Sequence, residues 1–147
     1  MQDLFKGAMK LGLRIQPSQE FQFRQYFQEL TDWNRRMNLT SVVELQRVEK
    51  VHFLDSLTVS LSLPKEVLFR GSLVDVGSGA GFPGVPLKIL FPTMSVTLIE
   101  SVAKKTAFLE HLVRVLGISG IAVRTGRSEI FARDPALREK FDVVVSR

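Results

Sequence analysis

The chain has 147 residues, of which 45% are hydrophobic, and these values are typical of a single globular domain that can bury a sizeable core. It contains no cysteine, which excludes disulfides, thiolate metal sites and a cysteine nucleophile, and its two histidines are too far apart in sequence to indicate a local zinc motif. Twenty Lys and Arg against fifteen Asp and Glu give a net charge of +5, a weak signal that favours a polyanionic partner.

Helical patterns account for the first 70 residues. Pro17 and Ser18 precede a run of apolar residues at helical spacing, and we expect Ser18 to be the N-cap of this helix. A second helical pattern covers residues 44–62 and ends before Pro64. Neither stretch contains a strand pattern, so we interpret residues 1–70 as a helical N-terminal extension.

Strands and helices alternate from residue 71 onward. We predict helices at 84–91 and 104–116 and strands at 72–76, 95–100, 121–125 and 141–147. This alternation implies right-handed βαβ units and a parallel sheet. The predicted fold is therefore α/β, an open parallel sheet formed by residues 71–147.

Residues 73–84, LVDVGSGAGFPG, hold four of the ten glycines of the chain. The cluster follows the first predicted strand, and an open parallel sheet binds its ligands at the carboxyl ends of its strands. Glycines at such a position let the backbone N–H groups approach a ligand, so we predict that Gly77 and Gly79 line a binding site. The alternative is a mobile glycine-rich turn, against which the regular G-x-G-x-G spacing argues.

The spacing of this loop differs from two common nucleotide-binding motifs. The dinucleotide motif G-x-G-x-x-G places its third glycine five residues after the first, whereas Gly81 follows Gly77 by four, and no Gly-Lys-Ser/Thr of a P-loop is present. The acidic Asp75 just before the loop suits a cationic ligand better than a pyrophosphate. The pattern D-x-G-x-G-x-G resembles the first motif of class I S-adenosylmethionine-dependent methyltransferases, in which this loop holds the methionine part of the cofactor.

Three residues at or just after the ends of the next two predicted strands extend this site. Glu100 ends the second predicted strand, where a carboxylate can accept hydrogen bonds from both hydroxyls of a ribose. This position favours an adenosine cofactor without deciding which one, and a solvated acid is the alternative. Ser128 and Glu129 follow the third strand, where methyltransferases bind the edge of the adenine, although a simple helix cap explains the two residues as well.

Six segments together resemble one family, the glucose-inhibited division protein B family, which is the small-subunit ribosomal RNA methyltransferase G family. They are MNLTSV (37–42), HFLDSL (52–57), VDVGSGAGFPGVPLKI (74–89), SVAKKTAFL (101–109), GRSE (126–129) and FDVVVSR (141–147). The resemblance runs from about Trp33 to the last residue, and the FPG and His-x-x-Asp-Ser segments are its most specific parts. It implies a Rossmann-like class I methyltransferase fold and S-adenosylmethionine contacts at Gly77, Phe82, Ser128, Glu129 and Arg147.

The resemblance also implies a reaction and a partner. The reaction is methyl transfer to N7 of one guanine in 16S rRNA, and the partner is that rRNA or the small ribosomal subunit. Because N7 carries a lone pair and no proton, we expect no catalytic base. Family members continue past the last predicted strand and the class I sheet normally has more strands, so we expect a core that is incomplete at the C-terminus.

Other predictions concern the surroundings of the site. His52 and Asp55 share one helix face, where they contact RNA or pair across helices. Candidate phosphate contacts are Lys104, Lys105, Arg124, Arg127, Arg133 and Arg138. We expect a cytoplasmic monomer without metal or membrane, since neither a membrane span nor the apolar core of a signal peptide is present.

Three alternative functions stay open on the sequence. A methyltransferase acting on a small molecule or a protein shares the whole cofactor site, and only the net charge and the family resemblance favour RNA. A non-catalytic cofactor-binding fragment is a second alternative for so short a chain. A dinucleotide oxidoreductase is a third, against which the four-residue glycine spacing argues.

Overall fold

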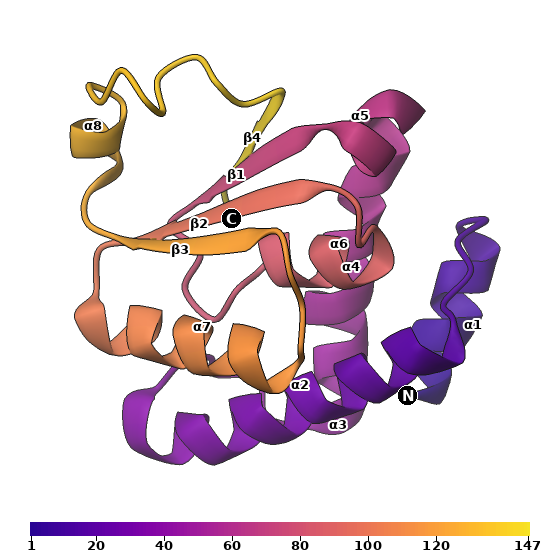
Figure 1. Ribbon diagram of the computed structural model, residues 1–147. Coiled ribbons are helices and arrows are strands. Elements are labelled where there is room, and N and C mark those ends of the chain that lie inside the picture. Colours follow the sequence, from indigo (N-terminus) through magenta and orange to yellow (C-terminus); the bar gives the residue numbers. More distant parts are fainter.

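A sheet of four parallel strands lies at the centre of the computed structural model, which describes all 147 residues (Figure 1). The strands are β1 (Ser72–Val76), β2 (Ser95–Glu100), β3 (Ile121–Thr125) and β4 (Val143–Val145), in the order β3-β2-β1-β4. The chain moves outward from β1 through β2 to β3 and then returns to the other side of β1 for β4. Such a reversal leaves a crevice at the carboxyl end of the central strand, where parallel sheets bind their ligands.

The predicted parallel α/β sheet is confirmed, and the first three strands have their predicted bounds. The fourth strand, predicted at 141–147, was placed too broadly. The strand register with β1 covers three residues, from Leu73↔Val143 to Asp75↔Val145, and one further backbone hydrogen bond precedes it, from Asp142 N to Ser72 O at 2.9 Å. Beyond this stretch the contact with β1 passes through a side chain, since Ser146 Oγ donates to Val76 O at 2.9 Å.

Two helices, α6 (Gly84–Leu90) and α7 (Ala103–Val115), pack directly on one face of the sheet. The long helix α2 (Pro17–Met37) packs in turn against both of them, so this side of the molecule has three layers (Figure 1). The layers share one core, to which α2 contributes the fully buried Phe23 and Tyr26. Ser18 is not the N-cap of α2: the cap is Gln16, because Pro17 occupies the first helical position, where its missing N–H is not needed.

The remaining N-terminal helices form a chain of short elements beside this core. The predicted helix at 44–62 is helical throughout but changes its winding three times, as α3 (Leu45–Val48), the π-helical turn η1 (Glu49–Leu54), α4 (Asp55–Thr58) and the 3-10 turn η2 (Val59–Ser62). Among these N-terminal helices, α1 (Gln2–Lys10) and α5 (Lys65–Arg70) were not predicted. The division of the chain at residue 70 into an extension and a cofactor-binding core stays a prediction.

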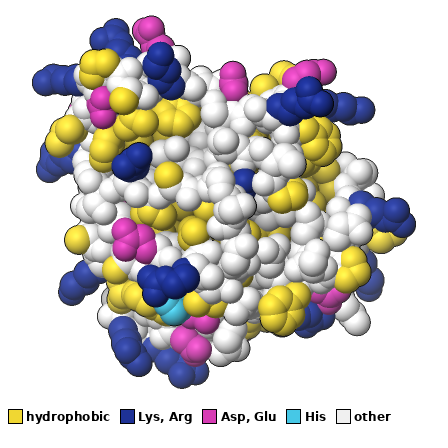
Figure 2. Space-filling model, viewed as in Figure 1, with side chains coloured by type: hydrophobic (Ala, Val, Ile, Leu, Met, Phe, Trp, Pro, Cys, Tyr) yellow, Lys and Arg dark blue, Asp and Glu magenta, His cyan; other side chains and the backbone are white.

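The second face of the sheet has a thinner cover. Only the one-turn helix α8 (Ser128–Phe131) and the irregular segment 132–142 lie over it (Figure 1). Apolar atoms are exposed between α8 and β4, whereas Lys and Arg side chains are spread around the margins of the molecule (Figure 2). Val144 of β4 is 68% exposed, in keeping with this open face. None of the helices combines the length and the apolar character that crossing a membrane requires.

Candidate functional site

The glycine loop after β1 adopts a conformation that only glycine adopts easily. Gly77, Gly79 and Gly81 have positive φ angles of 73°, 57° and 98°. A Cβ added at Gly77 meets no atom within 4 Å, whereas one added at Gly81 lies 2.7 Å from the Tyr26 hydroxyl oxygen. Gly77 therefore keeps a space open above the loop, and Gly81 makes room for the core beneath it.

The amides of this loop are mostly used within the protein. Gly77 and Ser78 both donate to Ile99 O, at 2.8 and 3.0 Å, so the loop is fastened to the end of β2. The N–H groups of Gly77 and Gly79 therefore both have acceptors within the chain. The predicted place of these two glycines in a cofactor site stays a prediction. Among the amides of residues 77–82, that of Ala80 has no acceptor in the chain. Gly77 thus offers a ligand open space rather than a hydrogen bond.

Glu100 fixes the loop from the side of β2. Its side chain is almost fully buried, with Oε2 accepting from the Gly79 amide at 2.8 Å and Oε1 from the Val102 amide at 2.9 Å. A carboxylate has about four acceptor positions, so two remain for other donors. The predicted contact with ribose hydroxyls stays a prediction, and the structure adds a role in shaping the loop.

A polar cavity of about 290 Å³ opens beside this loop. It brings together three predicted site residues from two distant segments, Gly77 after β1 and Ser128 and Glu129 after β3. Val76 and Ile99 form its apolar wall. Sequence reasoning missed Ser101 and Gly126, which also line it, although they directly follow the second and third predicted strands. Arg127, predicted as a phosphate contact, lines the cavity as well.

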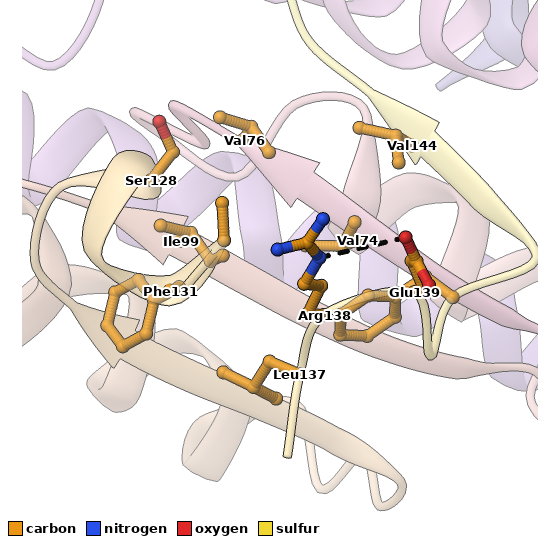
Figure 3. Close-up of a pocket in the computed structure, with 11 residues that line it drawn as sticks. Val74, Val76, Ile99, Ser128, Phe131, Leu137, Arg138, Glu139 and Val144 are labelled. Atoms are coloured by element: carbon orange, nitrogen blue, oxygen red, sulfur yellow. Dashed lines mark ion pairs between the residues drawn. The ribbon is translucent and has the colours of Figure 1, made fainter. Parts of the chain in front are cut away.

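A larger apolar cavity of about 510 Å³ adjoins the polar one (Figure 3). The two cavities share Val76, Ile99 and Ser128. The apolar cavity lies between the open face of the sheet and the segment that crosses it, with Phe131 of α8 among its lining residues. Arg138 and Glu139 form an ion pair of 3.6 Å at this cavity (Figure 3). The site therefore joins a polar chamber to an apolar one at the carboxyl end of β1 and β2.

Phe82 and Arg147 do not line this cavity. Phe82 is buried and stacks between His52 and Tyr26, with ring centroids 4.5 and 5.4 Å apart. The Arg147 guanidinium lies over the same ring, 5.1 Å from its centroid. The two residues belong to a second cluster, which connects the end of β4 with η1 and α4. Their predicted contact with a cofactor stays a prediction.

Arg147 is held by several acceptors in this cluster. Nη1 donates to Val51 O at 3.0 Å and to Asp55 Oδ2 at 2.9 Å, and Nη2 lies 3.0 Å from His52 Nδ1. A guanidinium only donates, so His52 Nδ1 is the acceptor here, and the proton of the neutral ring is on Nε2, which faces Thr40 Oγ1 at 2.8 Å. Burial, together with the charge of Arg147, lowers the pKa of His52. His52 and Asp55 both pair with Arg147, which follows β4, so the structure shows a contact with the end of the chain instead of pairing across helices. Their contact with RNA stays a prediction.

Asp75 lies under the loop rather than on its ligand side. Its side chain is fully buried, and Oδ2 accepts from the Gly84 amide at 2.9 Å, at the start of α6. Oδ1 has no hydrogen-bond partner. Burial raises the pKa of Asp75 to about 7. The expectation that Asp75 faces a cationic ligand is wrong, because its side chain is fully buried on the helix side of the sheet, where it holds the start of α6.

Comparison with known proteins agrees with this geometry. Residues 19–147 match the family described as rRNA small subunit methyltransferase G. The protein named ribosomal RNA small subunit methyltransferase G is 48% identical in Roseiflexus castenholzii and 44% identical in Dehalococcoides mccartyi, each over 147 residues. These alignments cover 100% of this chain and 62% and 61% of the two relatives, so the chain spans less than two thirds of their length.

Solved structures with a similar fold are more distant in sequence. MtNAS in complex with MTA and tNA matches with a TM-score of 0.56 and 17% identity over 87% of this chain and 47% of that protein. A mutant of MtNAS in complex with S-adenosylmethionine matches with a TM-score of 0.53 and 17% identity over 87% and 49%. These likenesses concern the fold alone. On the family match and the identities to its curated members, the chain belongs to the rRNA small subunit methyltransferase G family.

Proposed function

We propose that this chain contains the cofactor site of an S-adenosylmethionine-dependent methyltransferase that modifies N7 of a guanine in 16S rRNA. The observation that carries the proposal is the polar cavity beside the glycine loop, in which Gly77, Ser128 and Glu129 meet, in a chain of this family. The relatives bear the name of an rRNA methyltransferase, and one fold neighbour has been solved with S-adenosylmethionine.

The residues present fit this cofactor. The polar and the apolar cavity, about 290 and 510 Å³, are in the size range of small-molecule sites. Glu100 does not itself line the cavity but stands between Ile99 and Ser101, which do, and its free acceptor positions suit the two hydroxyls of a ribose. Val76 and Ile99 suit the flat faces of a purine. Ser128 and Glu129 supply polar groups for the adenine edge. The open space above Gly77 and the amide of Ala80 suit the methionine part.

Phe82 and Arg147 support the site in a different way from the other five predicted cofactor residues, which are Gly77, Gly79, Glu100, Ser128 and Glu129. Phe82 immediately follows the glycine loop, and its stacking with His52 and Tyr26 fixes the end of that loop. Arg147 fixes the end of β4 beside it. We therefore propose that both residues keep the cofactor site in shape, whether or not they touch the cofactor.

Methyl transfer to N7 needs no catalytic acid or base among the side chains. The bound cofactor supplies a methyl group that its sulfonium already activates. N7 of guanine has an in-plane lone pair and no proton, so no residue has to act as a base. What remains for the chain is to orient the two reactants and exclude water, which can be worth roughly 7–11 kcal/mol of the barrier.

Exposed cations near the cavity support an RNA substrate. Four exposed arginines lie here: Arg124 near the end of β3, Arg127 at the polar cavity, and Arg133 and Arg138 after α8. Lys104 and Lys105 begin α7 close to the end of β2. Such cations can neutralise phosphates around the site and position the RNA. With this substrate we place the protein in the cytoplasm, as a monomer that needs no metal.

The test combines product mapping with binding. Mass-spectrometric mapping of 16S rRNA, treated with the protein and S-adenosylmethionine or left untreated, is expected to find one N7-methylguanine that depends on the protein. Calorimetry is expected to detect S-adenosylmethionine and its demethylated product but not NAD. Binding of the cofactor with methylation of a protein or small molecule instead of rRNA would contradict the substrate, and binding of NAD alone would contradict the cofactor.

A further inference from the structure

A third cavity, about 390 Å³ in volume, lies on the other side of β1 from the polar cavity. Its walls come from α4, η2, Pro83 and the end of β4, including Ser146 and Arg147. Ser146 Oγ donates to the carbonyl of Val76, a residue that lines the polar cavity. A lining residue of the third cavity is therefore hydrogen-bonded to a lining residue of the polar cavity, so the walls of the two cavities meet at the end of β1.

The third cavity contains one carboxylate with a free oxygen. Asp55 lines it with a side chain that is 55% exposed. Oδ2 accepts from Arg147 Nη1 at 2.9 Å, and Oδ1 has no hydrogen bond within the chain. Arg147 is itself held by Val51 O and His52 and lies over the ring of Phe82. A fixed guanidinium therefore orients the carboxylate, and the group left for a ligand is an acceptor.

The hydrogen-bonding groups that Asp55 and Arg147 have free distinguish between possible ligands. Three of the five N–H groups of Arg147 already donate to Val51, Asp55 and His52, so most of the guanidinium is engaged within the protein. A free carboxylate oxygen calls for a ligand with N–H donors. The Watson–Crick edge of guanine presents two adjacent donors, N1–H and the N2 amino group, whereas adenine presents an acceptor at N1. N7 is on the opposite side of the base, so a guanine held by this edge keeps N7 free.

We propose that this third cavity receives the target guanine and that Asp55 determines its identity by accepting hydrogen bonds from N1–H and the N2 amino group. Arg147 acts as a positioning residue that orients Asp55. The inference rests on the proposed function and adds to it the residue that selects the base. Reading of an exposed base by its Watson–Crick edge is the usual way in which proteins recognise unpaired RNA bases specifically.

The test pairs a change in the protein with a change in the base. Two 16S rRNA substrates carry guanine or inosine at the methylated position; inosine lacks the N2 amino group but keeps N7, N1–H and the carbonyl. For the wild-type protein we expect kcat/KM to be about tenfold or more lower with inosine, because the Asp55 carboxylate loses a donor. For Asp55→Ala we expect a lower kcat/KM with guanine and a guanine-to-inosine ratio close to one.

Controls separate this role from a structural one. Asp32→Ala removes another carboxylate that pairs with an arginine, the exposed pair with Arg35 at 3.8 Å, and is expected to keep both the wild-type rate and the wild-type ratio. The affinity of Asp55→Ala for S-adenosylmethionine, measured by calorimetry, is expected to stay within about twofold of wild type. If Asp55→Ala lowers both rates by the same factor, its role is structural and the inference is overturned.

The wild-type measurement alone keeps the inference falsifiable if Asp55→Ala does not fold. Equal kcat/KM for guanine and inosine in the wild-type protein overturns the role of Asp55 but leaves the proposed function intact. Absence of any N7 methylation of the guanine substrate overturns both. The two failures are therefore distinguishable.

Discussion

A pair of glycine substitutions tests the proposed cofactor site most directly. Gly77 and Gly117 both have positive φ angles, 73° and 61°, and a Cβ added at either position meets no atom within 4 Å. Alanine therefore introduces the same kind of backbone strain at both, about 1–2 kcal/mol of folding free energy. For a chain of this size, that corresponds to a fall in Tm of roughly 2–8 °C in each variant.

The two variants differ in what surrounds the new methyl group. Gly77 lines the polar cavity, whereas Gly117 follows α7 and does not. Overpacking a well-fitted site costs typically 1–3 kcal/mol, so Gly77→Ala is expected to bind S-adenosylmethionine about 5- to 150-fold more weakly by calorimetry. Gly117→Ala is expected to bind it with wild-type affinity. Equal affinities in the two variants, at similar losses of Tm, would refute the assignment of this cavity.

Three further predictions follow from the same structure. At saturating substrate, the rate of methylation is expected to be constant from mildly acidic to mildly alkaline pH, because N7 has no proton to lose. The same constant rate is expected in His52→Ala. A bell-shaped pH profile in the wild type that loses one limb in His52→Ala would contradict this. The folded-state pKa of Asp75, about 7, lies above its unfolded value, so unfolding experiments in denaturant are expected to show a stability that falls between about pH 4 and pH 7. In Asp75→Asn, whose amide oxygen can still accept from Gly84, most of this decline is expected to disappear, and an unchanged decline would show that another group causes it. Affinity for 16S rRNA is expected to fall steeply with salt concentration as counterions are released, and a flat dependence would favour a small-molecule substrate.

Local patterns account for the parts of the fold that the sequence predicted well. The three strands with correct bounds are short apolar runs of five or six residues, and their shortness, their β-branched residues and the turns beside them distinguish them from helices. Helix α1 was missed although Leu4 and Ala8 have helical spacing and are both buried. The length of β4 depends on its pairing with β1, which lies about 70 residues away, so no local signal marks where it ends.

In the site, too, features that depend on neighbouring residues were predicted from the sequence, and contacts between distant segments were not. The glycine loop, Glu100 and the segment after β3 can be assigned to one edge from the strand order alone, because the carboxyl ends of parallel strands meet there. The orientation of Asp75 depends on how the central strand is covered. The pairing of Arg147 with His52 and Asp55 joins residues more than 90 positions apart, and nothing in either segment specifies the other. Sequence reasoning therefore predicted that residues of the polar cavity lie together, but it did not predict the pairing of Arg147 with His52 and Asp55.

Two buried carboxylates explain why the loop keeps one shape around an open space. Glu100 holds the Gly79 amide from the side of β2, and Asp75 holds the Gly84 amide from beneath. The stacking of Phe82 fixes the segment between these two points. A loop fastened in this way loses little conformational freedom when a ligand binds, so more of the contact energy remains as affinity. Substituting either carboxylate is then expected to weaken cofactor binding through loss of this order, even though Asp75 itself does not reach the cavity.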